Sequence, residues 1–225
     1  MNEEWDDEEL KATVEAYVEM QRDERLGQPF IKKHYYKRLA EVFGRGEKAY
    51  EYRMQNISYV LALMGRSWVT GLKPARNIEA AIAAKIEKFL WETQGQKATP
   101  VAAFKIAVRD ELKQKNPVIP RGNPKPKSRR VTVTQFRRNA PVAAWVLQQA
   151  EGTCECCEKA APFKNVDGLP HLELHYMRQL VDGGQDVISN AVALCPNCHR
   201  EIHHGASAHA LVAWLYDNVG RLIPE

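Results

Sequence analysis

The sequence predicts an α+β protein, in which a mostly helical N-terminal domain precedes a smaller domain built on strands and a metal site. Apolar residues recur at helical spacing through most of the first 113 residues. All five cysteines lie between positions 154 and 198. Residues 114–130 form a basic, proline-rich segment without acidic side chains, which is typical of an extended linker. We therefore expect domains at 1–113 and 131–225.

The helical periodicity can be followed segment by segment in the N-terminal domain. Apolar side chains at three- or four-residue steps predict helices over residues 6–25, 31–43 and 47–64. The alanine-rich segment 75–92 predicts a fourth helix, and a fifth is expected at 100–114. Acidic residues open the first of these helices, where the helix dipole favours negative charge. Pro100 after Thr99 suits the first turn of the last one. A sixth short helix is expected at 140–150.

Composition and charge narrow the classes of function. Hydrophobic residues make up 44% and charged residues 27% of the chain, as in ordinary globular proteins. The sequence contains no apolar run long enough to span a membrane and opens with acidic residues instead of a secretory signal, so a cytoplasmic location is expected. Beyond residue 30 the chain carries an excess of 11 basic residues, which favours a polyanionic partner.

The cysteines indicate zinc. Cys154 and Cys157 form one CxxC pair, and Cys195 and Cys198 form another. Two such turns present four thiolates in pairs, which is the tetrahedral ligand set that structural zinc prefers. Cys156 has the poorer spacing for chelation and is expected to be a non-ligand. Because disulfides are rare in the cytoplasm, the pattern predicts a metal site.

A second group of candidate ligands lies between and just after the two CxxC pairs. Alternation in LELHY predicts a strand that contains His175, and the sequence DGG at 182–184 predicts a turn. His199 and His203 are four residues apart, so both lie on one face of a helix and can bind one metal ion.

In this order the motifs resemble the HNH, or ββα-metal, nuclease family, and in particular its zinc-stapled, McrA-like branch of modification-dependent restriction endonucleases. The match runs from about Ala144 to His204. The resemblance implies a catalytic divalent ion, Mg²⁺ or Mn²⁺, bound by His175 and His199, with His203 as a further ligand. It also implies that Asn190 ties the loop that positions the strand.

Tyr176 departs from the family pattern. The family usually has a second histidine after the first ligand and a proline three residues later, whereas this chain has Tyr176 and then Gln179. The resemblance gives Tyr176 the place of the general base. A free tyrosine has a pKa near 10, against about 6.5 for histidine. The alternative is a domain that binds DNA and metal but cuts slowly or not at all.

The N-terminal domain resembles, more weakly, the helical head domain of some McrA-like nucleases. The expected function is a DNA endonuclease whose helical domain selects the site. The alternatives are a DNA-binding module built on a decayed nuclease and a purely structural zinc domain. The expected partner is double-stranded DNA with 5-methylcytosine or 5-hydroxymethylcytosine, and cutting both strands favours a homodimer. The candidate phosphate contacts are Lys32, Lys33, Lys37, Arg38, Arg53, Lys125, Lys127, Arg129 and Arg130.

Overall fold

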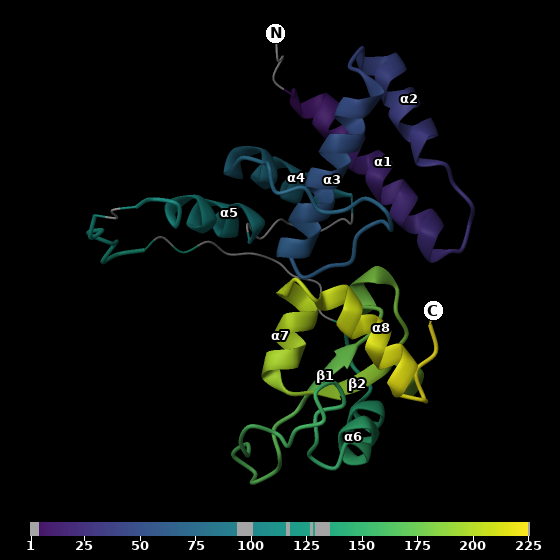
Figure 1. The fold of residues 1–225 in the computed structure, drawn as a ribbon, viewed down its shortest axis with the longest axis vertical. Helices are drawn as coiled ribbons and strands as arrows, with labels where there is room; N and C mark the ends of the chain where they lie inside the picture. Colours follow the sequence, from purple (N-terminus) through teal and green to yellow (C-terminus); the bar gives the residue numbers. More distant parts are fainter. Residues whose placement is uncertain (1–4, 94–100, 116–117, 127, 129–135, 225) are drawn as a thin grey trace. The chain divides into compact units, whose positions relative to one another are not determined.

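The computed structural model describes residues 5–93, 101–115, 118–126, 128 and 136–224. The chain divides into two compact units, Met1–Thr134 and Gln135–Glu225. The first unit runs from purple to teal in Figure 1, and its regular elements are all helices within the described residues. The second unit, green to yellow, combines helices with a two-stranded sheet. The predicted α+β class is confirmed.

The helices of the N-terminal unit follow the apolar periodicity of the sequence. They are α1 (Asp7–Arg25), α2 (Lys32–Phe43), α3 (Glu47–Leu63), α4 (Ala80–Glu92) and α5 (Ala102–Glu111). The carboxylate of Asp6 accepts a hydrogen bond from the backbone N–H of Glu9 at 2.7 Å and so caps α1. Gly44 adopts a positive φ of 79° and ends α2, because a residue without a Cβ tolerates that conformation.

One apolar core joins these helices, with a few polar groups buried inside it. Its fully buried large side chains include Leu10, Tyr17, Met20, Tyr50, Met54, Ile57, Leu61, Ile86, Leu90 and Ile106. The hydroxyl of Tyr17 lies 2.7 Å from that of Ser58 and accepts from the backbone N–H of Val69 at 3.0 Å. The phenol of Tyr50 donates to Glu9 at 2.7 Å. These polar groups are paired, so their burial does not destabilise the core.

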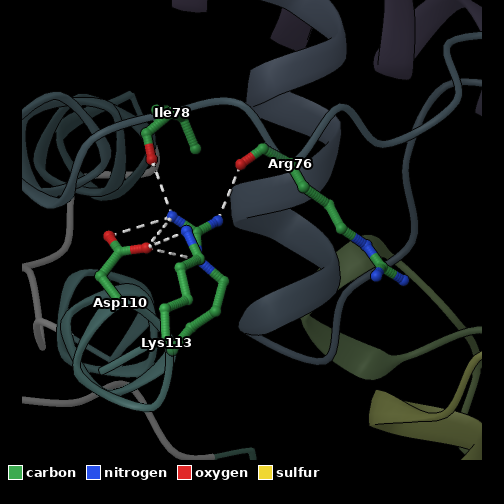
Figure 2. Close-up of polar contacts among 5 residues, drawn as sticks. Arg76, Ile78, Asp110 and Lys113 are labelled. Carbon is green, nitrogen blue, oxygen red and sulfur yellow. Dashed lines mark hydrogen bonds and ion pairs between the residues drawn. The ribbon is translucent and has the colours of Figure 1, made fainter. Parts of the chain in front are cut away.

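The expected helix over 75–92 begins only at Ala80. The carbonyl groups of residues 75–78 accept hydrogen bonds from side chains of other elements. They are therefore not part of the backbone hydrogen bonding of a helix. Asn56 donates to the carbonyls of residues 75 and 77, at 2.9 and 3.3 Å. Arg109 of α5 donates to those of Arg76 at 2.7 Å and Ile78 at 3.2 Å (Figure 2). Tertiary contacts therefore set the start of α4.

The expected helix over 100–114 is shorter in the structure, from Ala102 to Glu111. The proposed cap at residues 99 and 100 lies outside the described residues. Instead, the buried carboxylate of Glu87 on α4 accepts from the backbone N–H groups of Val101 and Ala102, at 2.8 and 3.0 Å. Glu87 therefore satisfies the free N–H groups at the start of α5 and joins the two helices.

The C-terminal unit has a ββα core. Helix α6 (Ala140–Gln149) precedes the strands β1 (Glu173–Tyr176) and β2 (Ala191–Leu194), and helix α7 (Pro196–His204) follows them. The strands are antiparallel, with Glu173 opposite Leu194 and Tyr176 opposite Ala191. Helix α8 (Ala208–Asn218), which the sequence analysis did not predict, packs on α7.

Glu155, between the first two zinc-ligand candidates, joins the C-terminal segment to the sheet. Its carboxylate accepts two hydrogen bonds from Arg221, at 2.6 and 2.7 Å, and one from the backbone of Ala193 at 2.7 Å.

Within the described residues, no helix combines the length and the apolar character needed to cross a membrane.

We expect the Arg109→Ala substitution to destabilise the N-terminal unit. It leaves the carbonyl groups of Arg76 and Ile78 without this donor, which corresponds to about 1–2 kcal/mol of unfolding free energy. Urea unfolding followed by circular dichroism measures the change. Arg76→Ala is the matched control, because the Arg76 guanidinium points away from this cluster (Figure 2). Equal stability of the two variants would contradict this role of Arg109.

Candidate metal centres

The structure brings together the two CxxC pairs that the sequence singled out. The sulfur atoms of Cys154, Cys157, Cys195 and Cys198 all lie within 4.8 Å of one another. The sulfurs of Cys157 and Cys195 are 4.0 Å apart. Ligands about 2.3 Å from a tetrahedral zinc ion lie about 3.8 Å from each other, so the cluster has the dimensions of a structural zinc site.

Backbone donors around the cysteines favour thiolates. The N–H of Cys195 donates to the sulfur of Cys154 at 3.2 Å, and that of Cys198 to the sulfur of Cys195 at 3.5 Å. Burial opposes ionisation of Cys154, but the surrounding N–H groups lower its pKa. Burial raises the pKa of Cys198. A bound cation would offset that cost, since zinc ligands are deprotonated. Cys156 is also buried but does not belong to the cluster.

The second cluster consists of three histidines from two elements. His175 lies on β1, and His199 and His203 lie one turn apart on α7. One ring nitrogen from each lies within 4.8 Å of the others. The Nε2 atoms of His199 and His203 are 3.1 Å apart. Two nitrogens about 2.1 Å from one ion, at angles of about 90–109°, lie about 3.0–3.4 Å apart, so the geometry suits a shared metal ion.

Electrostatics keep this cluster in a state that can bind metal. Burial, together with the neighbouring His203 and His199, lowers the pKa of His175 to about 3. The imidazole is therefore neutral at pH 7 and keeps a lone pair. Glu173 lies 2.6 Å from Nδ1 of His199, which leaves Nε2 for the ion. The pKa of Glu173 is lowered, chiefly by this hydrogen bond.

The loop between the two strands is held by Asn190. The side-chain amide donates to the carbonyl groups of Arg178 at 2.9 Å and Gln185 at 2.8 Å. Its oxygen accepts from the backbone N–H of Arg178 at 2.8 Å. At Gly184, an added Cβ would lie 2.0 Å from the Arg178 carbonyl, so only glycine fits this close approach. Asn190 is therefore a structural clamp on the strand that carries His175.

Tyr176 occupies a different environment from that of His175. Successive side chains of a strand point to opposite faces, and Tyr176 packs in the apolar core of the unit. Its hydroxyl donates to Asp186 at 2.9 Å. Burial, followed by the contact with Asp186, raises its pKa to about 12, against a smaller lowering by Arg138. The net effect of these surroundings is to keep the phenol of Tyr176 protonated at neutral pH.

Three residues make contacts around the site that the sequence did not predict. Glu173 precedes His175 by two positions on the same strand, so both side chains lie on one face of the sheet. This spacing could have predicted that Glu173 lies near the metal ligands. Gln179, at the position of the family proline, lies 3.4 Å from Nδ1 of His203. Asp186 binds both Tyr176 and, at 2.5 Å, the backbone N–H of Asn139 before α6. No local pattern marks Asp186, because its partners are distant in sequence.

The candidate phosphate contacts differ in their environments. Lys33, Lys37 and Lys125 are exposed. Arg38 pairs with Glu19 at 2.8 Å. Arg53 is half-buried, with its guanidinium 4.6 Å from the centre of the Trp5 ring. Lys32 lines a hollow of about 870 Å³ between α2, α3 and residues 70–72, together with Lys33. The remaining candidates, Lys127, Arg129 and Arg130, lie outside the described residues.

Comparison with known proteins assigns the second unit. Residues 154–205 match the sequence family described as HNH endonuclease. Together with the ββα core and the two ligand clusters, this match defines an HNH endonuclease domain. This part of the chain is homologous to McrA type IV restriction enzymes. It is 47% identical, over 103 residues, to the type IV methyl-directed restriction enzyme EcoKMcrA of Escherichia coli strain K12.

These similarities are limited in extent. The alignment with EcoKMcrA covers 46% of this chain and 37% of that enzyme, so the chain spans little more than a third of its length. The structure of the type IV phosphorothioation-dependent restriction endonuclease ScoMcrA aligns with 68% of this chain and 23% of that one. Its sequence identity is 23% and its TM-score 0.35.

We expect Cys195→Ala to remove bound zinc and unfold the C-terminal unit. Structural zinc binding contributes directly to folding free energy, so a lost ligand lowers the melting temperature as well as the metal content. Elemental analysis and thermal unfolding measure both. Cys156→Ala is the matched control and should keep one zinc ion per chain. Parental zinc content and melting in Cys195→Ala would refute the assignment.

Glu173 should position His199 without binding the catalytic ion itself. Glu173→Ala removes the carboxylate at Nδ1 and is expected to weaken Mn²⁺ binding by about 10–100-fold. Glu173→Gln keeps a hydrogen-bond acceptor and should recover part of that affinity. Isothermal titration calorimetry of the zinc-loaded protein measures this difference. Unchanged Mn²⁺ affinity in Glu173→Ala would exclude a positioning role.

Proposed function

We propose that the chain is a metal-dependent DNA endonuclease that hydrolyses phosphodiester bonds, and that it acts as a restriction enzyme on DNA containing modified cytosine. The observation that carries this proposal is the cluster of His175, His199 and His203 on a ββα core, with Glu173 beside His199. The homology of the C-terminal part to EcoKMcrA, a methyl-directed enzyme by its description, supports the substrate class.

The residues of the site have separate tasks in the proposed reaction. Mg²⁺ or Mn²⁺ bound by the three histidines would neutralise charge on the scissile phosphate and its leaving 3′ oxygen. His175 contributes a neutral imidazole from β1 because its pKa is low. Glu173 orients His199 on α7. Asn190 holds the loop behind β1, so the ligand on the strand and those on the helix keep their separation.

The substrate and assembly belong to the same proposal. The partner is double-stranded DNA, with 5-methylcytosine or 5-hydroxymethylcytosine as the modification. The helical domain (1–113) would recognise the site, and the basic segment 114–130 would connect it to the nuclease domain (131–225). Because each chain has one cluster of three histidines among its described residues, cleavage of both strands favours a homodimer. A cytoplasmic location fits such a role.

One observation favours a second candidate function, a DNA-binding protein with an impaired nuclease site. The phenol of Tyr176 donates to Asp186, and its pKa is raised to about 12. At pH 7 a tyrosine with that pKa is almost entirely protonated, so it is a hydrogen-bond donor. Tyr176 at the general-base position would then slow or prevent cleavage.

Metal-dependent nicking of plasmid DNA tests the proposed function. We expect the parent protein to nick modified plasmid with Mg²⁺ or Mn²⁺ and to stop when EDTA is added. His199→Ala should reduce nicking at least about hundredfold, because it removes a ligand of the ion. Its zinc content and DNA binding should remain parental. His209→Ala, in an exposed histidine of α8 outside the cluster, is the control. Parental nicking by His199→Ala would refute the assignment.

Substitutions at Tyr176 separate an active enzyme from an impaired one. If the phenolate is the base, the rate should rise with pH toward 12, and Tyr176→Phe should lose about hundredfold. We expect neither result, because Asp186 keeps the proton on the phenol. Tyr176→Phe should instead cut within about tenfold of the parent, which is below the usual effect of a general base. A parent that does not cut, combined with cleavage by Tyr176→His, would support the impaired alternative.

A further inference from the structure

A loop beside the histidine cluster exposes apolar side chains. Residues 158–171 connect the first CxxC pair to β1 and extend away from the two strands as a green loop in Figure 1. Three large apolar side chains of this segment are accessible: Phe163 is 53% exposed, Leu169 60%, and Val166 fully so. We call residues 163–169 the apolar tip. Grouped apolar exposure of this kind marks an interaction site more often than isolated exposure does.

The apolar tip has a defined conformation. The side-chain oxygen of Asn165 accepts from the backbone N–H groups of Asp167 and Leu169, both at 3.0 Å. The N–H of Asn165 donates to the carbonyl of Leu169 at 2.8 Å, which closes the turn. Gly168 has a φ of +78°, the left-handed conformation that glycine adopts without strain. The backbone of the tip is thus ordered before a partner binds, so binding costs less conformational entropy than it would for a flexible loop.

The base of the apolar tip is fixed to the candidate active site. The rings of Phe163 and His171 stack at 4.6 Å, and the backbone N–H of His171 donates to the Phe163 carbonyl at 2.8 Å. Nε2 of His171 lies 3.9 Å from one oxygen of Glu173. The other oxygen of Glu173 lies 2.6 Å from His199. The base of the apolar tip is therefore connected through His171 to the residue that orients a metal ligand.

The size of the apolar tip distinguishes between its conceivable partners. Three side chains supply on the order of 300 Å² of apolar surface. A stable protein interface buries about 800 Å² per partner, so the tip is too small to hold a second copy or another protein by itself. Branched and aromatic apolar side chains of this size do enter the grooves of duplex DNA, where they partly unstack a base step. Lys164 and Asp167 of the tip are both exposed, so the tip carries no net charge, and Lys164 is the side chain that can lie against a phosphate.

We propose that the apolar tip is a wedge for duplex DNA. Val166 and Leu169 enter a groove next to the scissile phosphate and partly unstack the adjacent bases, while Lys164 lies against the backbone. This inference rests on the proposed function, since it assigns the DNA a position on the same site. The wedge acts on binding and on DNA geometry, and the bound phosphodiester is cleaved by the histidine centre.

The test compares two full-length variants. Val166→Ser with Leu169→Ser removes the apolar surface at exposed positions, where the fold does not depend on it. Ile223→Ser removes an apolar side chain of similar exposure, 63%, outside the loop. Binding to a 30-base-pair duplex is measured by fluorescence anisotropy in EDTA, with and without 5-methylcytosine. Unstacking is measured with 2-aminopurine in the duplex, and cleavage in single turnovers with saturating protein and Mn²⁺.

We expect the double variant to bind the duplex about tenfold more weakly and to lose the change in 2-aminopurine fluorescence that reports unstacking. Ile223→Ser should behave as the parent in binding, in unstacking and in cleavage. Parental binding and unstacking by the double variant would overturn the proposal, as would a change in oligomeric state without a change in DNA binding. A parent that binds and unstacks DNA without cutting it would overturn the proposed function alone. A parent that binds no duplex would overturn both.

Discussion

The four-cysteine cluster is the constraint on which the C-terminal unit depends. Strands β1 and β2 have four residues each, and an isolated two-stranded sheet of that size is only marginally stable in water. The cluster joins the turn that contains Cys154 and Cys157 to the turn between β2 and α7. A metal ion held there connects segments about 40 residues apart, so the free energy of metal binding becomes free energy of folding.

The geometry of the histidine centre depends on this link between the two cysteine turns. Cys195 is the N-cap of α7 and Cys198 lies in its first turn, so the four-cysteine cluster lies where the helix begins. His199 and His203 then face His175 across the unit. Burial is the main reason for the low pKa of His175, and repulsion from His203 and His199 when they are protonated adds to it. Because the imidazole of His175 is neutral at pH 7, its lone pair remains available to a metal ion.

Buried polar contacts play a comparable part in the helical unit, where no metal cluster occurs among the described residues. Glu87 on α4 binds the start of α5, while Arg109 on α5 binds carbonyl groups ahead of α4 (Figure 2). Each helix therefore supplies a side chain that hydrogen-bonds to the backbone at, or just before, the start of the other helix. Helices α4 and α5 also pack against each other.

The sequence by itself determined the features whose causes are local. Apolar spacing predicted the first three helices of the first unit, alanine content the fourth, and Thr99 with Pro100 the fifth. The CxxC and HxxxH spacings predicted the pairs within each metal cluster, because about one turn of chain sets the distance within a pair. The tertiary structure decided the rest. Residues 75–79 are not helical because side chains of α3 and α5 bind their carbonyl groups. Glu173 meets His199, and Tyr176 meets Asp186, only after segments distant in sequence have packed together.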